Sequence, residues 1–389
     1  MADETLSNET VGDATDRSLA STVLAPRYLL GVLGIVAFAV LPLVGISTTQ
    51  LLVLIGAFYF GMFAMSWDVV SGYTGEISFG HALFFAVGGY TSTLLNLGFG
   101  LSPALSIPAG VVLAALAGVL IGVPALRVRG PYLSLITLVA PLILLQIFII
   151  YGDVFGGELG LSSPAALVTA DAFDLVVTAN YYIALGLFVV ILLTLFAVTR
   201  SNIGSVLTAI REDEDAVAAA GLNVAKFKLF AFVLSAAIGG LAGAMFVHTP
   251  VGSPRPSQLL ALLVSIEVLI AAILGGMGTI VGAGLGGVFF YFISELLSQQ
   301  EFVIPVINVG INEASLLIFA LVAMAIIYAL PQGMFPWAIR AGRRLLGRVR
   351  GNPVATDGGH ETRDPIEQTA SRYRRAFDEL EERLTGDEK

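Results

Sequence analysis

Long apolar stretches alternate with short polar segments from residue 28 to residue 330 of this chain. Each stretch has about the 20 residues that a helix needs to cross ~30 Å of hydrocarbon. The ten stretches are Tyr28–Gly45, Gln50–Val70, Ser78–Leu97, Ala104–Leu126, Tyr132–Tyr151, Tyr181–Val198, Leu229–His248, Gln258–Leu274, Ile280–Leu297 and Ala314–Leu330. The third, eighth and ninth are short, Gly-rich or interrupted by polar groups, so some are expected to be broken or re-entrant. The pattern predicts an all-α integral membrane protein, a polytopic bundle of about eight to ten transmembrane helices.

The cationic residues fall on one side when the stretches are threaded through a bilayer from a cytoplasmic N-terminus. Arg255 alone falls in an outside loop. The residues that fall inside are Arg17, Arg27, Arg127, Arg129, Arg200, Arg211, Lys226, Lys228, Arg340, Arg343, Arg344, Arg348 and Arg350. This is the asymmetry of the positive-inside rule. It predicts a multi-pass plasma-membrane protein with both termini in the cytoplasm.

The composition supports this assignment and limits the chemistry. The chain is 56% hydrophobic and 13% charged, which excludes an ordinary soluble domain. It contains no Cys and only three His, so neither a metal site nor a cofactor is expected. One of these, His248, ends a span and is expected at the membrane interface. Acidic, Lys-poor polar segments indicate a high-salt cytoplasm, as in a halophilic archaeon.

The chain divides into a membrane domain and two tails. Residues 1–27 are expected to be a disordered acidic cytoplasmic tail, residues 28–330 the transmembrane domain, and residues 331–389 a cytoplasmic tail that is first basic and then acidic. The Arg residues after the last span suit anionic lipid headgroups.

Glycine spacing predicts where helices approach closely. Gly278, Gly282 and Gly286 recur every four residues, and small residues at that spacing let helices pack closely in lipid. They serve either packing within one bundle or a subunit interface. The segments Ser71–Tyr90 and Leu274–Tyr291 share a Gly-rich entry followed by an aromatic-bearing span. Such pairs are typical of inverted repeats around a central pathway, so they form a candidate inverted repeat.

The polar insert over residues 199–228, here called the elbow, is the sharpest functional signal. Ser201 or Asn202 can cap a short helix on which Ile203, Val206, Leu207 and Ile210 share one face. A second short helix is expected over Glu212–Ala220, with Gly221 ending it in a left-handed conformation. A soluble partner could grip such an element. The alternative is an amphipathic loop that lies on the lipid headgroups.

No motif in the chain supplies an energy source. No Gly is followed by Lys, so a Walker A loop is absent from the sequence, and no protease, triad or dinucleotide motif has a credible context. The chain is therefore not expected to be an enzyme; it moves, anchors or senses something.

Four stretches resemble one protein family. Asp215-Ala216…Gly221 resembles a degenerate form of the Glu-Ala-Ala…Gly loop of ABC importer permeases, although the Leu-Pro pair that closes the loop in many of them is missing. The stretches S-G-Y-T-G-E-I-S-F-G-H-A, L-R-V-R-G-P-Y-L-S-L-I-T-L and S-I-E-V-L-I-A-A-I-L-G-G-M-G-T-I-V-G resemble the branched-chain amino acid permease family, in the right order. The resemblance covers residues 50–300 and is strongest to the M-type subunit.

This resemblance implies partners and a role for the elbow. The partners would be a second permease subunit, two ABC ATPase subunits, an extracellular substrate-binding protein and membrane lipid, with no nucleic acid. The elbow would seat in an ATPase groove. Its coupling residues would be Ile203, Gly204, Leu207, Ile210, Arg211, Glu212, Asp213, Asp215 and Gly221.

The translocation path is a separate hypothesis. Glu267 lies in an apolar run, where a carboxylate costs about 2.5–3.5 kcal/mol at mid-bilayer and should face a cavity or a partner. The candidate path residues are Tyr73, Glu76, Ser78, His81 and Glu267. The alternative is that Glu76 and His81 stabilise local structure and that Glu267 bonds a neighbouring helix.

Two other functions compete with an amino-acid importer. One is an ABC permease for another small solute, such as urea or a short amide. The other is an ion-coupled secondary transporter, which the elbow and the lack of a carboxylate network within the spans disfavour.

Overall fold

The computed structural model describes residues 26–126, 131–299, 303–304, 309–310, 320–321, 324–326, 328–330 and 333–349. The predictions for residues 1–25, for most of the tenth stretch and for the tail beyond residue 349 lie outside this set. The chain divides into two compact units, Met1–Trp337 and Ala338–Lys389. The description below concerns the first.

The regular secondary structure of the described chain is helical apart from one two-stranded pair, β1 (Val303–Ile304) with β2 (Val309–Gly310). The helices before the elbow are α2 (Pro26–Val40), η1 (Leu41–Val44), α3 (Thr48–Thr74), α4 (His81–Phe99), α5 (Pro103–Ala125), α6 (Pro131–Ile150), α7 (Gly152–Phe155), η2 (Gly157–Leu159) and α8 (Phe173–Arg200). The remaining helices are α9 (Asn202–Glu212), α10 (Glu214–Ala219), α11 (Val224–Phe246), α12 (Pro256–Leu259), α13 (Leu262–Gly275), α14 (Ile280–Ser298) and α16 (Met334–Val349).

Eight helical segments of the described chain are long and apolar enough to cross a membrane, which confirms the predicted all-α polytopic class. The eighth stretch is broken as expected, because α12 ends at Leu259 and α13 begins at Leu262. The ninth is one continuous helix, so it is not among the broken spans. The third begins at His81 instead of Ser78, after a loop over residues 75–80.

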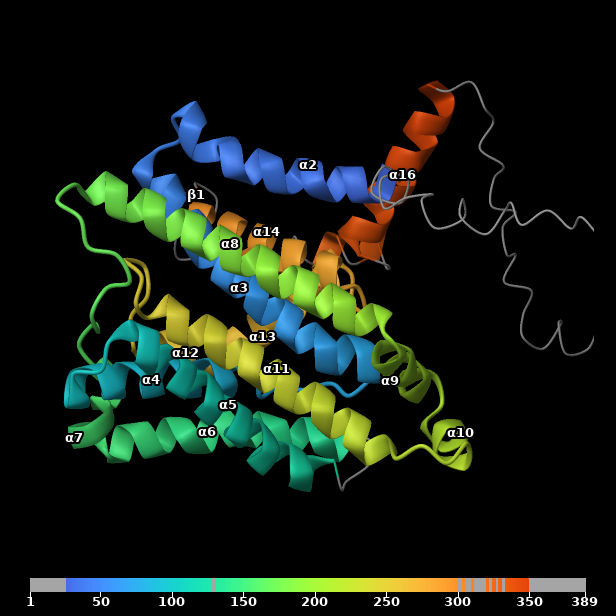
Figure 1. Ribbon diagram of the computed structural model, residues 1–389, viewed down its shortest axis with the longest axis horizontal. Helices are drawn as coiled ribbons and strands as arrows, with labels where there is room; N and C mark the ends of the chain where they lie inside the picture. Colours follow the sequence, from blue (N-terminus) through green and yellow to red (C-terminus); the bar gives the residue numbers. More distant parts are fainter. Residues whose placement is uncertain are drawn as a thin grey trace, which may run out of the picture. The chain divides into compact units, whose positions relative to one another are not determined.

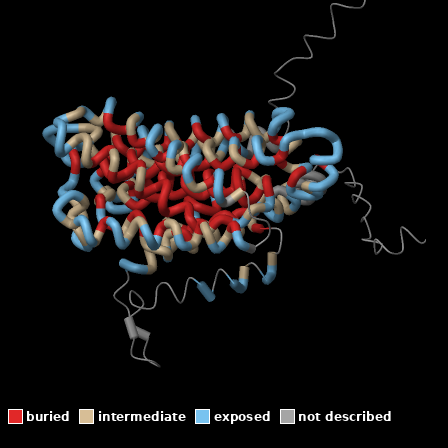
Figure 2. The backbone as a smooth tube through the Cα atoms, turned by 90° about the horizontal axis from the view of Figure 1, so that it is seen from below, coloured by how far each residue is buried: buried red, intermediate tan, exposed pale blue. Residues whose placement is uncertain are grey.

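Helix α3 lies at the centre of the bundle, between α8 and α14 on one side and α11 with α4 and α5 on the other (Figure 1). Its apolar window is entirely buried, whereas only 28%, 22% and 28% of the windows of α5, α6 and α8 are buried. The mean hydropathy of α3 is 1.6, lower than the 2.4, 2.6 and 2.6 of α5, α6 and α8, so hydrophobicity alone does not explain why α3 is the enclosed helix. Figure 2 shows the buried backbone running through the middle, with exposed residues around it.

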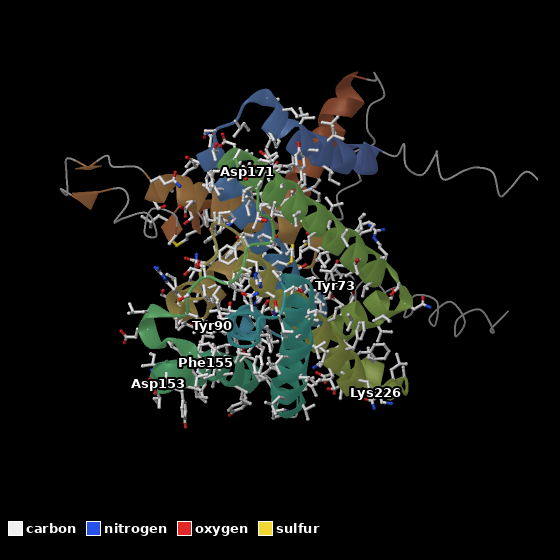
Figure 3. All side chains as sticks on the ribbon, turned by 60° about the vertical axis from the view of Figure 1, so that its left-hand side comes forward. Tyr73, Tyr90, Asp153, Phe155, Asp171 and Lys226 are labelled. Carbon is white, nitrogen blue, oxygen red and sulfur yellow. The ribbon has the colours of Figure 1, made fainter. Side chains whose placement is uncertain are left out.

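The elbow and the long loop over residues 160–172 lie at opposite ends of the bundle, since the single long helix α8 separates them (Figure 1). Figure 3 shows the same separation, with Lys226 at one end and Asp153 at the other. Here the first is called the elbow end and the second the loop end. Arg200 and Arg211 lie at the elbow end, and Arg255 lies at the loop end beside Gly160.

The Gly positions divide between packing and turn formation. A Cβ atom on Gly282 would lie 2.8 Å from the Gly275 carbonyl oxygen, and one on Gly286 would lie 2.6 Å from Gly275 Cα, so both allow α13 and α14 to approach closely. The prediction that Gly278 takes part in helix packing is wrong, because Gly278 lies in the turn before α14 with φ +77° and not on a helix face. This close contact is within the chain.

The candidate inverted repeat is not found in the two segments that suggested it. The Gly-rich entries before α4 and before α14 both contact Arg211 at the elbow end, through Gly75 and Gly278. The two following helices run in the same direction away from that end, so the segments are not related by inversion.

Candidate functional site

The elbow consists of α9 and α10, joined at Asp213. Ser201 precedes α9, but its hydroxyl donates to the Val198 carbonyl (2.7 Å) and does not cap α9. Asp213 caps α10 by accepting from the Ala216 N–H (2.9 Å), so α10 begins at Glu214 and not at Glu212 as predicted. Gly221 has φ +85°, which confirms the predicted left-handed ending.

The apolar face of α9 anchors the elbow to its own bundle. Leu207 is 0% exposed and Ile210 3% exposed, and Ile210 packs with Val217 and Val224. Ile203, by contrast, is 37% exposed. The prediction that Leu207 and Ile210 form apolar contacts with a partner is therefore corrected: they face inward because the bundle offers the apolar surface that their helical spacing requires. Ile203 and Leu222 remain accessible.

A close approach fixes the angle between α8 and α9. Gly204 is buried, and a Cβ atom there would collide with the Thr199 carbonyl oxygen. Gly204 is therefore needed for the turn between α8 and α9. Its predicted role in the coupling element would be to permit this turn.

An ion-pair cluster holds α10 to the bundle. The Lys228 ammonium, with a side chain only 8% exposed, lies 2.5 Å from Glu76 Oε1 and 2.7 Å from Glu214 Oε2. Glu76 thus joins the loop before α4 to the start of α11 at the elbow end. This contact supports the alternative role for Glu76, the stabilisation of local structure.

Arg211 attaches the end of α9 to the end of α3. Its Nη1 donates to the Gly72 carbonyl oxygen (2.8 Å), and its Nε and Nη2 donate to Glu212 Oε1 (3.1 and 2.8 Å). The contact with Gly72 ties the elbow directly to the central helix.

Asp68 on α3 is a polar residue that the sequence analysis missed. It is 0% exposed, and its Oδ1 accepts from the Gly278 N–H (2.7 Å). Among the described residues, its Oδ2 has no hydrogen-bond partner. The available signal was a carboxylate inside a 27-residue apolar helix, which is rare and functional by default.

The open face of the elbow is acidic. The side chain of Glu212 is 69% exposed, and Asp213 and Asp215 are also exposed, next to the exposed Lys226. With the apolar side turned inward, this leaves a mainly polar surface for a partner.

Ser78 and His81 belong to a buried hydrogen-bond network. His81 Nε2 lies 2.6 Å from Ser235 Oγ, which donates to the Ser66 carbonyl (2.5 Å), and His81 Nδ1 lies 3.2 Å from Ser78 Oγ. All four residues are 0% exposed. The network joins α4, α11 and α3, which fits the structural alternative for His81.

The other two path candidates lie apart from this network. Tyr73 is half-buried near the end of α3 and packs against the core. Glu267 is half-buried on α13, and within the described chain it makes no hydrogen bond or ion pair. The five predicted path residues therefore do not form one cluster.

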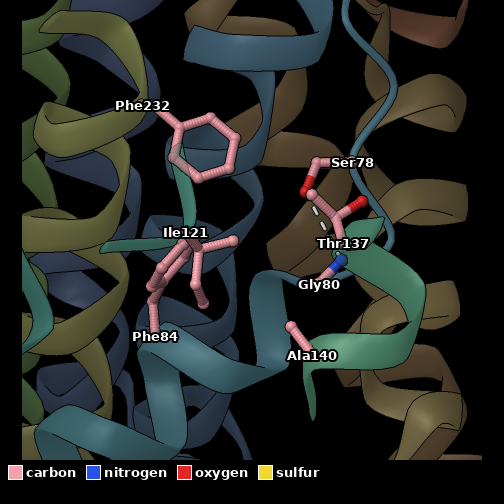
Figure 4. A pocket seen from close by; sticks show the side chains of 7 residues that line it. All are labelled: Ser78, Gly80, Phe84, Ile121, Thr137, Ala140 and Phe232. Atoms are coloured by element: carbon pink, nitrogen blue, oxygen red, sulfur yellow. Dashed lines mark hydrogen bonds between the residues drawn. The ribbon is translucent and has the colours of Figure 1, made fainter. Parts of the chain in front are cut away.

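A shallow recess lies where α6 meets the start of α4, and Figure 4 shows the side chains that line it. Its polar groups already have partners: Ser78 Oγ accepts from the Gly80 N–H (3.4 Å), and Thr137 Oγ1 accepts from the Phe79 N–H (3.2 Å). The recess is a packing feature.

At the loop end, His248 is buried and not interfacial as predicted. It is 1% exposed, and its Nε2 lies 2.7 Å from Ser92 Oγ, while its Nδ1 lies 2.6 Å from the Ala165 carbonyl oxygen. The sequence feature that could have indicated this burial is the position of His248 directly after α11, where the chain turns back toward the bundle.

A family model described as "Branched-chain amino acid transport system / permease component" matches residues 49–331. The chain belongs to this permease family. It is 30% identical over 308 residues to the high-affinity branched-chain amino acid transport system permease protein LivM of Salmonella typhimurium, covering 73% of this chain and 69% of that protein. It is also 30% identical over 293 residues to LivM of Escherichia coli, covering 69% and 66% respectively.

An archaeal relative extends the match. The probable branched-chain amino acid transport permease protein LivM of Methanocaldococcus jannaschii is 25% identical over 323 residues, covering 72% of this chain and 91% of that protein. The chain spans about two thirds of the length of the two enterobacterial relatives. No solved structure matches.

Proposed function

We propose that the chain is the membrane-spanning subunit of an ATP-driven importer for branched-chain or related amino acids. It would carry no ATPase site of its own and would work with a second permease subunit, two ABC ATPase subunits and an extracellular substrate-binding protein. The observation that supports this best is the elbow: it is anchored inward by Leu207 and Ile210 and presents an acidic, exposed face. Membership of the permease family supports the same assignment.

The proposed orientation follows from charge. The elbow end carries Arg200, Arg211, Lys226 and Lys228, and the described part of the loop end carries Arg255. By the positive-inside rule, the elbow end would face the cytoplasm, where ATPase subunits reside. Both termini would be cytoplasmic, in a plasma-membrane protein.

Membrane lipid is a further proposed partner. Helix α16 follows Gly333 and contains no acidic residue over Met334–Val349. Its sequence contains Arg340, Arg343, Arg344 and Arg348, and each Lys or Arg near an anionic surface adds about 1 kcal/mol of attraction.

Charge reversal on the elbow tests the proposed ATPase contact. Glu212→Lys with Asp215→Lys should lower ATP-dependent uptake by about tenfold or more and weaken ATPase co-purification, because opposed charges at an interface would become like charges. The measurement is co-purification from membranes together with uptake into vesicles. The matched control is Asp153→Lys with Asp171→Lys at the loop end, which should leave ATPase co-purification unchanged. Unchanged co-purification and uptake in the elbow variant would contradict the proposal.

The two competing functions are separated by different measurements. A thermal-shift screen of the cognate binding protein distinguishes amino acids from urea or short amides as the solute. Reconstitution of the chain alone in vesicles tests an ion-coupled transporter, since full-rate uptake driven by an ion gradient would exclude an ABC permease.

A further inference from the structure

One oxygen of the Asp68 carboxylate is buried without a hydrogen bond. Oδ1 accepts from the Gly278 N–H (2.7 Å), whereas Oδ2 has no partner among the described residues, and the side chain is 0% exposed. A buried carboxylate oxygen without a hydrogen-bond partner lowers the stability of the fold, so its retention needs an explanation. Asp68 lies six residues before the end of α3, within about 9 Å of the elbow end along the helix axis.

The guanidinium of Arg211 lies beside the same backbone. Arg211 Nη1 donates to the carbonyl of Gly72, and a Cβ atom on Gly72 would collide with Asp68 Oδ1. A Cβ atom on Gly278 would lie 2.8 Å from Arg211 Nη1, while the N–H of the same Gly278 binds Asp68. Asp68 and Arg211 therefore share Gly72 and Gly278 as neighbours.

In this state Arg211 pairs with a different carboxylate. Its Nε and Nη2 bond Glu212, which is 69% exposed and lies on the open face of the elbow. Glu212 is one of the residues proposed to meet the ATPase subunit. A partner that engages Glu212 would release the Arg211 guanidinium, and Asp68 is the buried acceptor within reach.

We propose that Arg211 is a two-position latch, paired with Glu212 and Gly72 in the state seen here and with Asp68 when the ATPase subunits move the elbow. The inference rests on the proposed function. Arg211 has a carboxylate partner in both positions, so neither position leaves the guanidinium without an anionic acceptor. In the second position, the pair would satisfy the Oδ2 atom of Asp68, which offsets the desolvation of the guanidinium.

The latch would also transmit the motion of the elbow. Gly278 lies in the turn between α13 and α14, and its N–H is held by Asp68. Arg211 would bind the free Oδ2 while Oδ1 keeps its hydrogen bond to Gly278, so Asp68 would link the moved elbow to this turn. The elbow would thereby act on α13, the helix that carries Glu267.

The substitution Asp68→Asn separates the latch from a structural role. Asn has nearly the size of Asp and keeps an oxygen that can accept from the Gly278 N–H. It lacks the negative charge with which Arg211 would pair. In the full complex reconstituted in vesicles, we expect normal assembly, unreduced thermal stability without nucleotide, and ATP hydrolysis within about twofold of wild type. Uptake should fall by about tenfold, the size of a typical coupling between sites.

The matched control and the double variant complete the test. Asp174→Asn makes the same change at the loop end, in a carboxylate that accepts from Thr48 Oγ1 (2.8 Å), and should leave uptake unchanged. Arg211→Gln should lose uptake as Asp68→Asn does, and the double variant should lose no more than either single one. Wild-type uptake in Asp68→Asn, failed assembly of that variant, or losses that multiply in the double variant would overturn the latch. Absence of ATP-dependent uptake in the wild type would instead overturn the proposed function and the latch with it.

Discussion

His248 shows how single buried residues organise the loop end. Its ring bonds Ser92 on α4 and the Ala165 carbonyl, and Ser92 Oγ lies 2.9 Å from Ser106 Oγ on α5. The Leu167 N–H donates to the His248 carbonyl oxygen (3.2 Å). These bonds hold a loop that has no regular secondary structure, and they bury the imidazole away from water.

This arrangement predicts acid sensitivity. Burial lowers the pKa of His248 below its ordinary value of 6.5, against the opposing effect of the Ala165 carbonyl. Above pH 6.5 the ring is neutral both in the fold and in the unfolded chain, so stability is fully present. As the pH falls below 6.5, the unfolded state takes up a proton first, and the folded state loses stability. Thermal unfolding of the purified protein between about pH 7 and pH 5 should show a falling Tm.

The control for that prediction is His248→Gln, which removes the titrating group. Its Tm should depend less on pH over the same interval, whatever its absolute value. Parallel pH profiles for the variant and the wild type would assign the acid sensitivity to other groups.

Residue-level predictions from the sequence succeeded where the cause is local. The ending at Gly221 follows from its own backbone freedom. The partners of Lys228 could not be predicted, because Glu76 is 152 residues away and reaches it only through the packing of α4 against α11. Asp68 meets Gly278 across 210 residues for the same reason. Contacts between residues far apart in the sequence therefore decide the partners of Glu76 and Asp68.

At the scale of elements, α13 and α14 pack through glycine. A Cβ atom on Gly286 would collide with the Ala271 carbonyl oxygen and lie 2.6 Å from Gly275 Cα. Small residues at this spacing bring two backbones together where lipid gives no hydrophobic driving force. The period of four residues identified the contact, but it could not show that Gly278 lies one turn too early, in the connection before the helix.

The substitution Gly286→Ala should therefore destabilise the α13–α14 pair. Overpacking of a close contact costs about 1–3 kcal/mol, and a lower Tm in detergent measures it. Gly186→Ala on α8 is the matched control, because no atom lies within 4 Å of the Cβ position there. Ala is also the better helix former by about 0.5–1 kcal/mol, so the control should be neutral or stabilising. Equal Tm values for the two variants would contradict the packing role.

Over the whole molecule, hydropathy predicted an all-α polytopic membrane protein, and not which helix lies at the centre. Both α3 and α6 are apolar along their lengths, yet α3 is enclosed and α6 mostly exposed. Gly56 and Gly61 are the feature of α3 that fits its enclosed position, because Tyr291 and Gly284 of α14 approach α3 closely at those two residues. The exposed apolar surfaces of α5, α6 and α8 suit contact with lipid or with a second subunit.

Glu267 is the residue whose role depends most on the assembled transporter. It is half-buried on α13 and makes no hydrogen bond or ion pair with any residue described, although a charged group within a span is costly. A polar environment supplied by the second permease subunit would account for it.

Glu267→Gln keeps the size of the side chain and removes the charge, so uptake should fall several-fold, on the order of 1 kcal/mol, while co-purification of all subunits stays unchanged. Glu295→Gln near the end of α14, where Oε1 already accepts from Gln299 Nε2 (3.2 Å), is the control and should retain uptake. A parallel loss of uptake and assembly in Glu267→Gln would instead assign Glu267 to the contact between subunits, because a group that lines the path affects transport without holding the subunits together.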